Sequence, residues 1–354
     1  MKNLTALSEE EKEKENKIME QLLDIISKTN KSANQILREF VESEKLLWPL
    51  AAANYDGLKS VEEKQFQFDG FQIKVQFNLE RMRSSAAKVD KQSIATRKCF
   101  LCSENRPAEQ DAIAFGEQFV ILVNPFPIFK THFTISCNSH IDQRFIPNVQ
   151  YLLELARAME GFTVFYNGPE CGASAPDHLH FQAGENGFMP IGDEFDRLKS
   201  SARKLFSGST ADVWAFDNYL RKMISVETNS MEEALKIIGI YYTHFQKMQP
   251  EKMEPMMNAL CAFSGGKWTI HLFPRKLHRP RQFFAEGNDQ LLISPASVDF
   301  GGVFITPRKE DFDKITKEDI EDIFNQVGLN QDTFQELTER IRTDLNRKYY
   351  VDQL

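Results

Sequence analysis

The feature that most restricts the fold of this chain is a segment in which small residues are followed by alternating polar side chains. A loop rich in glycine and other small residues, from Asn167 to Asp177, leads into His178, His180 and Gln182. In an extended strand, residues two apart point to the same face, so these three side chains share one face. The segment therefore predicts a strand that carries a polar site, entered from a loop that brings backbone amides close to a ligand.

The residue types in this segment suit chemistry at phosphorus. Neutral imidazole is a nucleophile near pH 7 because its ordinary pKa is about 6.5, so we predict that His180 attacks a phosphoryl group. Gln182 can hydrogen-bond a non-bridging oxygen but cannot exchange protons, which favours group transfer over hydrolysis. Gly172 and Ser174 of the loop are the predicted phosphate contacts. The alternative is a polar strand with two half-buried histidines.

A second pattern indicates a metal site. The spacing of Cys99 and Cys102 allows two thiolates to bind one zinc ion, and His132, His140 and His178 are available to complete a tetrahedral set. Four protein ligands close the coordination sphere, so the predicted zinc is structural. The alternative is a pair of unrelated thiols.

Charge and composition restrict the partners. The chain has 354 residues, of which 42% are hydrophobic, and its formal net charge is -8. This negative charge argues against sequence-independent binding of nucleic acid. The sequence contains no apolar run of about 20 residues that could cross a membrane. Five cysteines and a start without the apolar core of a secretory signal lead us to expect a cytoplasmic protein.

Hydrophobic periodicity predicts a mixed α and β architecture. We expect helices over 8–30, 32–47, 149–160 and 317–346, and helical structure between about 192 and 249. We expect a β-hairpin over 64–77 that turns at Asp69-Gly70. Further strands are expected over 119–123, 132–136, 162–166, 259–263, 268–273 and 302–306.

At these residues the sequence resembles the histidine-triad superfamily, and within it the transferase branch. That branch comprises galactose-1-phosphate uridylyltransferase, diadenosine tetraphosphate phosphorylase and GDP-L-galactose phosphorylase. The resemblance rests on the His-x-His-x-Gln pattern of residues 178–182 and spans roughly residues 81–306. It implies that His180 forms a covalent nucleotidyl intermediate and that Gln182 and Ser174 assist it.

The same resemblance implies a set of ligand contacts. It selects Cys99, Cys102, His140 and His178 as the zinc ligands. The implied nucleotide and phosphate contacts are Leu101, Asn124, Asn167, Gly172, Ser174 and Gln182. To these we add Lys267 and Arg275, which belong to a basic cluster and resemble a segment of the dinucleotide phosphorylases. Asp177 is an extra residue relative to the uridylyltransferase, and no segment reproduces that enzyme's sugar-recognition region.

The resulting prediction is an α+β fold with two related histidine-triad-like halves, each an antiparallel sheet flanked by helices. We expect an N-terminal helical segment (1–60), a catalytic half with the zinc site (61–190), a helical connector (191–250), and a C-terminal half with a helical tail (251–354).

The expected activity is transfer of a nucleotide from a nucleoside diphosphate-sugar or dinucleoside polyphosphate to phosphate or a sugar phosphate. Two alternatives remain: a catalytically silent, zinc-stabilised nucleotide sensor, and a hydrolase.

Overall fold

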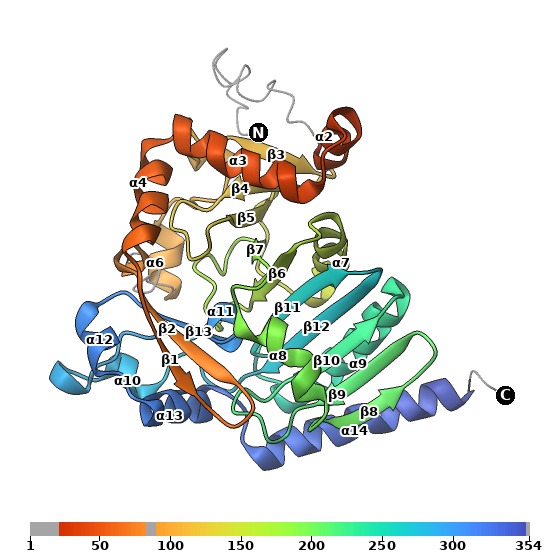
Figure 1. The fold of residues 1–354 in the computed structure, drawn as a ribbon. Coiled ribbons are helices and arrows are strands. Elements are labelled where there is room, and N and C mark those ends of the chain that lie inside the picture. Colours follow the sequence, from red (N-terminus) through yellow and green to blue (C-terminus); the bar gives the residue numbers. More distant parts are fainter. Residues whose placement is uncertain (1–20, 83–89, 352–354) are drawn as a thin grey trace, which may run out of the picture.

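In the computed structural model, which describes residues 21–82 and 90–351, a ten-stranded antiparallel sheet runs through the molecule (Figure 1). The strands follow the order β3-β4-β5-β7-β6-β11-β12-β10-β9-β8. Their bounds are β3 Ala112–Phe115, β4 Phe119–Val123, β5 His132–Cys137, β6 Phe162–Asn167, β7 His180–Glu185, β8 Arg203–Ser207, β9 Ala211–Ala215, β10 Ile224–Thr228, β11 Met257–Ser264 and β12 Lys267–Pro274.

The register of the sheet shows that it consists of two equivalent halves. The central strands β6 and β11 pair antiparallel, with Phe165 opposite Leu260. On the outer sides of this pair, Phe165 lies opposite Gln182 of β7, and Leu260 lies opposite His271 of β12. A local twofold axis between β6 and β11 therefore relates Gln182 to His271. The predicted two related α+β halves are confirmed, but they share one continuous sheet.

The two halves differ at the position of the predicted nucleophile. Two residues before Gln182 on β7 is His180, and the corresponding position on β12, two residues before His271, is Thr269. Thr134 of β5 pairs with Gln182 as Ser225 of β10 pairs with His271. The C-terminal half thus has a hydroxyl side chain where the N-terminal half has an imidazole.

Helices cover one face of the sheet, and a smaller sheet with further helices covers the other (Figure 1). The first face packs against α2 Leu22–Thr29, α3 Ala33–Leu47, α4 Pro49–Gly57, α7 Val149–Ala158, α9 Met231–Met248 and α14 Gln331–Val351. The second face packs against β1 Glu62–Gln67, β2 Gln72–Phe77, β13 Val303–Thr306, α8 Pro190–Lys199, α11 Ser297–Phe300, α12 Lys309–Lys314 and α13 Lys317–Val327. Along β7 the side chains alternate, so Phe181 enters the first core while His180 and Gln182 face the second side.

Short elements complete the described chain. They are α6 Lys91–Thr96, α10 Arg281–Phe284, and the 3₁₀ turns η1 Leu58–Ser60, η2 Leu79–Arg81, η3 Ser103–Asn105, η4 Ile146–Asn148 and η5 Gly287–Asp289. Among the helices of residues 21–82 and 90–351, none combines the length and the apolar character needed to span a bilayer.

Several local predictions are confirmed. The hairpin β1–β2 turns at Asp69-Gly70, and Gly70 has a φ of 77°, which favours glycine. The helix predicted over 32–47 is α3, and the structure adds that Ser32 caps it through a reciprocal capping box with Gln35. The first predicted helix lies partly outside the described residues, and its described part is α2. The predicted helical tail is two helices, α13 and α14, separated at Gly328.

The expectation of a helical connector over 191–250 is wrong for its middle part. Strands β8, β9 and β10 occupy residues 203–228, and only α8 and α9 at the two ends are helical. Each of these strands has five residues, too few for a strong alternating signal, and they are stabilised by pairing with one another and with the distant β12.

Candidate active site and metal centre

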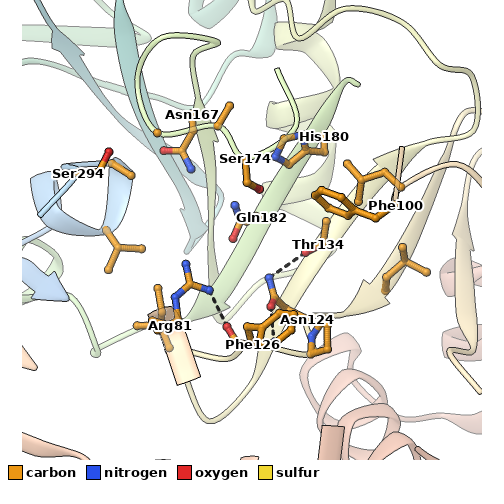
Figure 2. A pocket seen from close by; sticks show the side chains of 18 of the residues that line it. Arg81, Phe100, Asn124, Phe126, Thr134, Asn167, Ser174, His180, Gln182 and Ser294 are labelled. Atoms are coloured by element: carbon orange, nitrogen blue, oxygen red, sulfur yellow. Dashed lines mark hydrogen bonds between the residues drawn. The ribbon is translucent and has the colours of Figure 1, made fainter. Parts of the chain in front are cut away.

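A cavity of about 750 Å³ opens on the second face of the sheet, above β7. This volume lies within the range of small-molecule sites. His180, Gln182, Asn167, Gly172 and Ser174 all line it, and Figure 2 shows the first three with Ser174 grouped around one part of the cavity. The structure therefore brings together the side chains that the sequence predicted for nucleophilic attack and phosphate binding.

His180 is held in one tautomer by the backbone. Its Nδ1 lies 2.8 Å from the carbonyl oxygen of His178, so Nδ1–H donates and Nε2 keeps its lone pair. Burial lowers the pKa of His180 to about 4, so the ring is neutral near pH 7. The side chain of Gln143 accepts from the His180 amide at 2.8 Å and donates to the carbonyl oxygens of His180 and Asn167. Gln143, which sequence reasoning missed, therefore fixes the backbone of the predicted nucleophile.

Gln182 is oriented by a buried histidine of β5. The amide of Ile128 donates to His132 Nδ1 at 3.2 Å, so the proton of this neutral ring is on Nε2. His132 Nε2 lies 3.0 Å from Gln182 Oε1 and donates to it. Because the carbonyl oxygen of the carboxamide is engaged, its NH₂ group is the part left to face a ligand in the cavity. Gln182 therefore presents a donor, as phosphate binding requires.

Asn167 and the loop after it form a second group of donors. Asn167 Oδ1 accepts from Asn258 Nδ2 at 2.9 Å and from the Ser297 amide at 2.8 Å, which leaves its NH₂ group toward the cavity (Figure 2). Gly172 has a φ of 95°, and a Cβ there would lie 2.5 Å from the Cβ of Ala296. A residue other than glycine would therefore displace the loop that holds Ser174 at the cavity wall.

Four predicted ligand atoms converge beside this cavity. The nearest ligand atoms of Cys99, Cys102, His140 and His178 all lie within 4.8 Å of one another. The Cys99 Sγ–His178 Nδ1 and Cys102 Sγ–His140 Nδ1 distances are both 3.3 Å, and the two Nδ1 atoms are 3.2 Å apart. Ordinary zinc bond lengths at a tetrahedral centre give about 3.6 Å between S and N and about 3.3 Å between two N atoms. The four residues could therefore hold a metal ion.

The tautomer of His178 also fits a metal ligand. Its Nε2 lies 2.8 Å from the carbonyl oxygen of Cys137, so Nε2–H donates and the Nδ1 lone pair points into the cluster. Asp177, the extra residue of the loop, pairs with Arg97 at 2.6 Å and lies 3.8 Å from His140 Nε2. The insertion is thus accommodated in a turn next to the cluster without displacing His178.

Comparison with known proteins gives matches to family models and to solved structures. Two family models match: "Domain of unknown function (DUF4922)" over residues 40–185, and "GDPGP1-like, C-terminal domain" over residues 198–348. No curated protein sequence matches the chain. The structure of yeast Ap4A phosphorylase Apa2 is similar over 83% of this chain and 94% of its own, with 18% identity and a TM-score of 0.53.

The same yeast enzyme in complex with Ap4A gives 16% identity and a TM-score of 0.54, over 83% of this chain and 97% of that one. Its complex with AMP gives 16% identity and a TM-score of 0.51, over 88% of this chain and 98% of that one. The chain therefore shares the fold of this phosphorylase, and its C-terminal part matches the GDPGP1-like family model. The resemblance that the sequence suggested is therefore confirmed at the level of the fold.

Two predicted ligand contacts of the histidine-triad site do not line its cavity. Lys267 is exposed at the start of β12, opposite Ser264 at the turn of the β11–β12 hairpin. Arg275 is fully buried and donates to Asn258 Oδ1, to the Pro295 carbonyl oxygen and to carbonyl oxygens of the following loop. These hydrogen bonds link β11 to the loops after β12, so Arg275 has a structural role. The positions of Lys267 and Arg275 do not support contact with a phosphate in the cavity.

Sequence reasoning missed most of the charged side chains of the cavity. Arg81, Arg97, Arg279, His278 and Asp299 all line it. They come from η2, from the segment before Cys99 and from the loops after β12, which the fold brings together from distant parts of the chain. The basic run around residue 279 was visible in the sequence, but nothing in a single sequence indicates which of its members face a cavity.

Substitution of His132 tests how Gln182 is positioned. We expect His132→Phe to lower kcat for nucleotidyl transfer by about 10- to 100-fold with a smaller change in KM, because the Gln182 amide loses its fixed orientation toward developing charge. His132→Gln keeps an N–H donor and should recover part of kcat. Steady-state kinetics of the three proteins measure this, and an equal rise of KM in both variants would contradict a positioning role.

Buried neutral histidines should make stability depend on pH. Burial lowers the pKa of His132 and of His271 to about 3, whereas in the unfolded chain both have a pKa near 6.5. Their contribution is complete above about pH 6.5 and is lost as pH falls, because only the unfolded state then binds protons. Between pH 7 and pH 5 the protonation of each ring in the unfolded chain should lower the free energy of unfolding by about 2 kcal/mol. From pH 7 to pH 5 the free energy of unfolding, measured with urea, should fall by about 2 kcal/mol less in His271→Asn than in the unchanged chain. An equal fall in the two proteins would refute the prediction.

Proposed function

We propose that this chain is a nucleotidyltransferase or nucleotide phosphorylase that works through a covalent nucleotidyl-histidine. The observation that carries the proposal is the geometry of His180, whose Nδ1–H is committed to the His178 carbonyl oxygen while Nε2 retains its lone pair at the cavity wall. The donors of Gln182, Asn167 and Ser174 line the same cavity. This combination fits attack on a phosphoryl group better than it fits simple retention of a nucleotide.

In the first step His180 Nε2 attacks the α-phosphorus of the donor. The N–P bond forms as the bond from phosphorus to the bridging oxygen breaks, and the electron pair of that bond leaves with the sugar phosphate, or with the nucleoside polyphosphate when the donor is a dinucleoside polyphosphate. The imidazole gains positive charge as the bond forms, and the His178 carbonyl oxygen at 2.8 Å stabilises it. The NH₂ groups of Gln182 and Asn167 hydrogen-bond the non-bridging oxygens.

In the second step an oxygen of the acceptor attacks the same phosphorus and the N–P bond breaks. His180 returns to its neutral form, and the nucleotide leaves on phosphate or on a sugar phosphate. Gln182 cannot supply or remove a proton, so water gains no general base from this side chain. Transfer to an anionic acceptor should therefore outcompete hydrolysis.

We also propose that the metal cluster holds zinc in a structural role. Two thiolates and two imidazoles are the ligands that favour zinc, and four protein ligands leave no open position. A bound ion would fix the ring of His178 and with it the carbonyl oxygen that hydrogen-bonds His180. Catalysis and metal binding then both belong to the predicted half 61–190.

The donor in this proposal is a nucleoside diphosphate-sugar or a dinucleoside polyphosphate. The yeast structures with Ap4A and with AMP support a nucleotide or dinucleotide ligand in this fold. The nucleoside contacts we propose are Leu101 and Asn124, which line the cavity beside β4 and β5. The described cysteines are all free thiols, which suits the cytoplasmic location included in the proposal.

Intact-protein mass spectrometry tests the proposal. After incubation with separate nucleotide sugars and dinucleoside polyphosphates, the protein should gain the mass of one nucleotidyl group, and addition of phosphate or a sugar phosphate should remove it. Absence of any adduct, together with measurable nucleotide binding, would favour the sensor. Loss of the adduct at the same rate without an acceptor would favour the hydrolase.

A further inference from the structure

The two ends of the catalytic cavity differ in chemistry. Beside β4 and β5 the wall carries the large apolar side chains of Phe100, Leu101 and Leu122 together with Asn124 and Thr134. Beyond β6, the wall comes from the loops after β12 and carries Arg279, Ser294 and Asp299. In Figure 2, Ser294 lies on one side of Gln182 and Phe100 lies on the other. A nucleoside suits the apolar end, so the group that leaves from the α-phosphate extends to the polar end.

Asp299 is an unusual member of a wall that faces a phosphate. It lies in α11 and is only 7% exposed. Its Oδ2 accepts from the amide of Ala296 at 2.8 Å, and the backbone of Ile305 also hydrogen-bonds the carboxyl group. A carboxylate has about four acceptor positions. These two groups and the backbone of Asp299 itself, which also hydrogen-bonds the carboxyl group, leave acceptor capacity on a side chain that lines the cavity.

The surroundings of this carboxyl group restrict what can bind beside it. Burial raises the pKa of Asp299 to about 7, and the charge of Arg275 acts in the opposite direction. Arg81, which lines the same cavity and donates to the Phe126 carbonyl oxygen, also interacts with the charge of Asp299. In its ionised form Asp299 repels a further phosphate, whereas a hydroxyl group can donate a hydrogen bond to it.

We propose that Asp299 is a specificity-determining residue that accepts hydrogen bonds from the hydroxyl groups of the leaving group. Arginines at this end neutralise its single phosphate, and Asp299 recognises the sugar beyond it. This inference rests on the proposed function and narrows it, because the donor is then a nucleoside diphosphate-sugar. A dinucleoside polyphosphate instead places extra phosphates, each negatively charged, against the carboxyl group.

Calorimetric titration tests the proposal without requiring turnover when every protein compared, including the one unchanged at position 299, also carries His180→Ala and so cannot form the adduct. The ligands are UDP, ADP and GDP, their glucose, galactose and mannose conjugates, and the diadenosine and diguanosine tetraphosphates. For the preferred base, we expect the conjugate with one of the sugars to bind about 10-fold more tightly than the free diphosphate. Asp299→Ala should weaken binding of that conjugate by about 10- to 100-fold, the effect of one or two charge-assisted hydrogen bonds. Binding of the free diphosphate should change less than about twofold.

Two further variants separate recognition from folding. Asp299→Asn keeps an acceptor for the Ala296 amide and should retain an intermediate preference for the sugar conjugate. Asp289→Asn removes a carboxylate from an exposed position in the preceding loop and should bind all ligands as the unchanged chain does. An equal loss of affinity for free diphosphate and sugar conjugate in Asp299→Ala, or tighter binding of a tetraphosphate than of any sugar conjugate by the unchanged chain, would overturn the proposal.

The outcome also separates this inference from the proposed function. If the sugar preference depends on Asp299 but no donor forms an adduct with His180, the specificity assignment stands and the catalytic proposal fails. If an adduct forms only from the dinucleoside tetraphosphates, the catalytic proposal stands and the role of Asp299 is refuted.

Discussion

Replacement of His180 by alanine is expected to abolish formation of the nucleotidyl adduct and to lower the rate of transfer by about four to six orders of magnitude, as for loss of other enzymic nucleophiles. The reason is that Nε2 of His180 is the atom that forms the bond to phosphorus, and the hydrogen-bond donors around it cannot replace a nucleophile. Binding of the donor should fall much less, because Gln182, Asn167 and Ser174 remain. Transfer rates, adduct mass and donor affinity can be measured on the same preparation.

A matched histidine provides the control for this experiment. His244 lies on α9 and pairs with Asp344 of α14, on the helical layer of the opposite face. His244→Ala should therefore form the adduct at the rate of the unchanged chain. Residual adduct in His180→Ala, located by peptide mapping on another side chain, would show that the nucleophile has been assigned to the wrong residue.

The sequence predicted the catalytic strand because its information is local. Alternation of His178, His180 and Gln182 after a small-residue loop sets the face of β7 without reference to the remainder of the fold. The same holds for the turn at Asp69-Gly70. Each of these features depends on residues within a few positions, where backbone geometry alone decides the outcome.

Features that depend on distant pairing could not be predicted in this way. Strands β8 to β10 form because they add to an existing sheet edge at β12, and their five-residue lengths give little periodicity of their own. Lys267 and Arg275 belong to one basic run in the sequence, but the fold places Lys267 at an exposed hairpin turn and Arg275 in the interior. Conversely, Arg81 and Asp299 line one cavity from segments over 200 residues apart.

The selection of the metal ligands among the histidines also required the three-dimensional structure. On residue types alone His132, His140 and His178 were equivalent candidates. The structure places His140 and His178 in the cluster with Cys99 and Cys102. His132 points to Gln182 instead. The resemblance had selected the same set, because a related fold already contains the long-range information that a single sequence lacks.

Removal of the metal cluster is expected to have the second large effect. The purified chain should contain about one equivalent of zinc by elemental mass spectrometry, and the double substitution Cys99→Ala with Cys102→Ala should contain almost none. Without the ion the loop at 99–102 and the segment at 140 lose their shared anchor, so we expect the melting temperature to fall by about 5 °C, which corresponds to about 3–5 kcal/mol. Chelation of the unchanged chain should produce the same shift.

The cluster should influence chemistry as well as stability, since His178 supplies both a ligand nitrogen and the carbonyl oxygen that hydrogen-bonds His180. In the double cysteine variant, at a temperature where it remains folded, adduct formation should slow by about 10- to 100-fold. Cys137→Ala removes a buried thiol outside the cluster and should keep both the metal and the rate. If the unchanged chain binds no metal while Cys99 and Cys102 remain reduced, the cluster is a pair of thiols beside two histidines, and the positioning of His180 depends on Gln143 and the backbone alone.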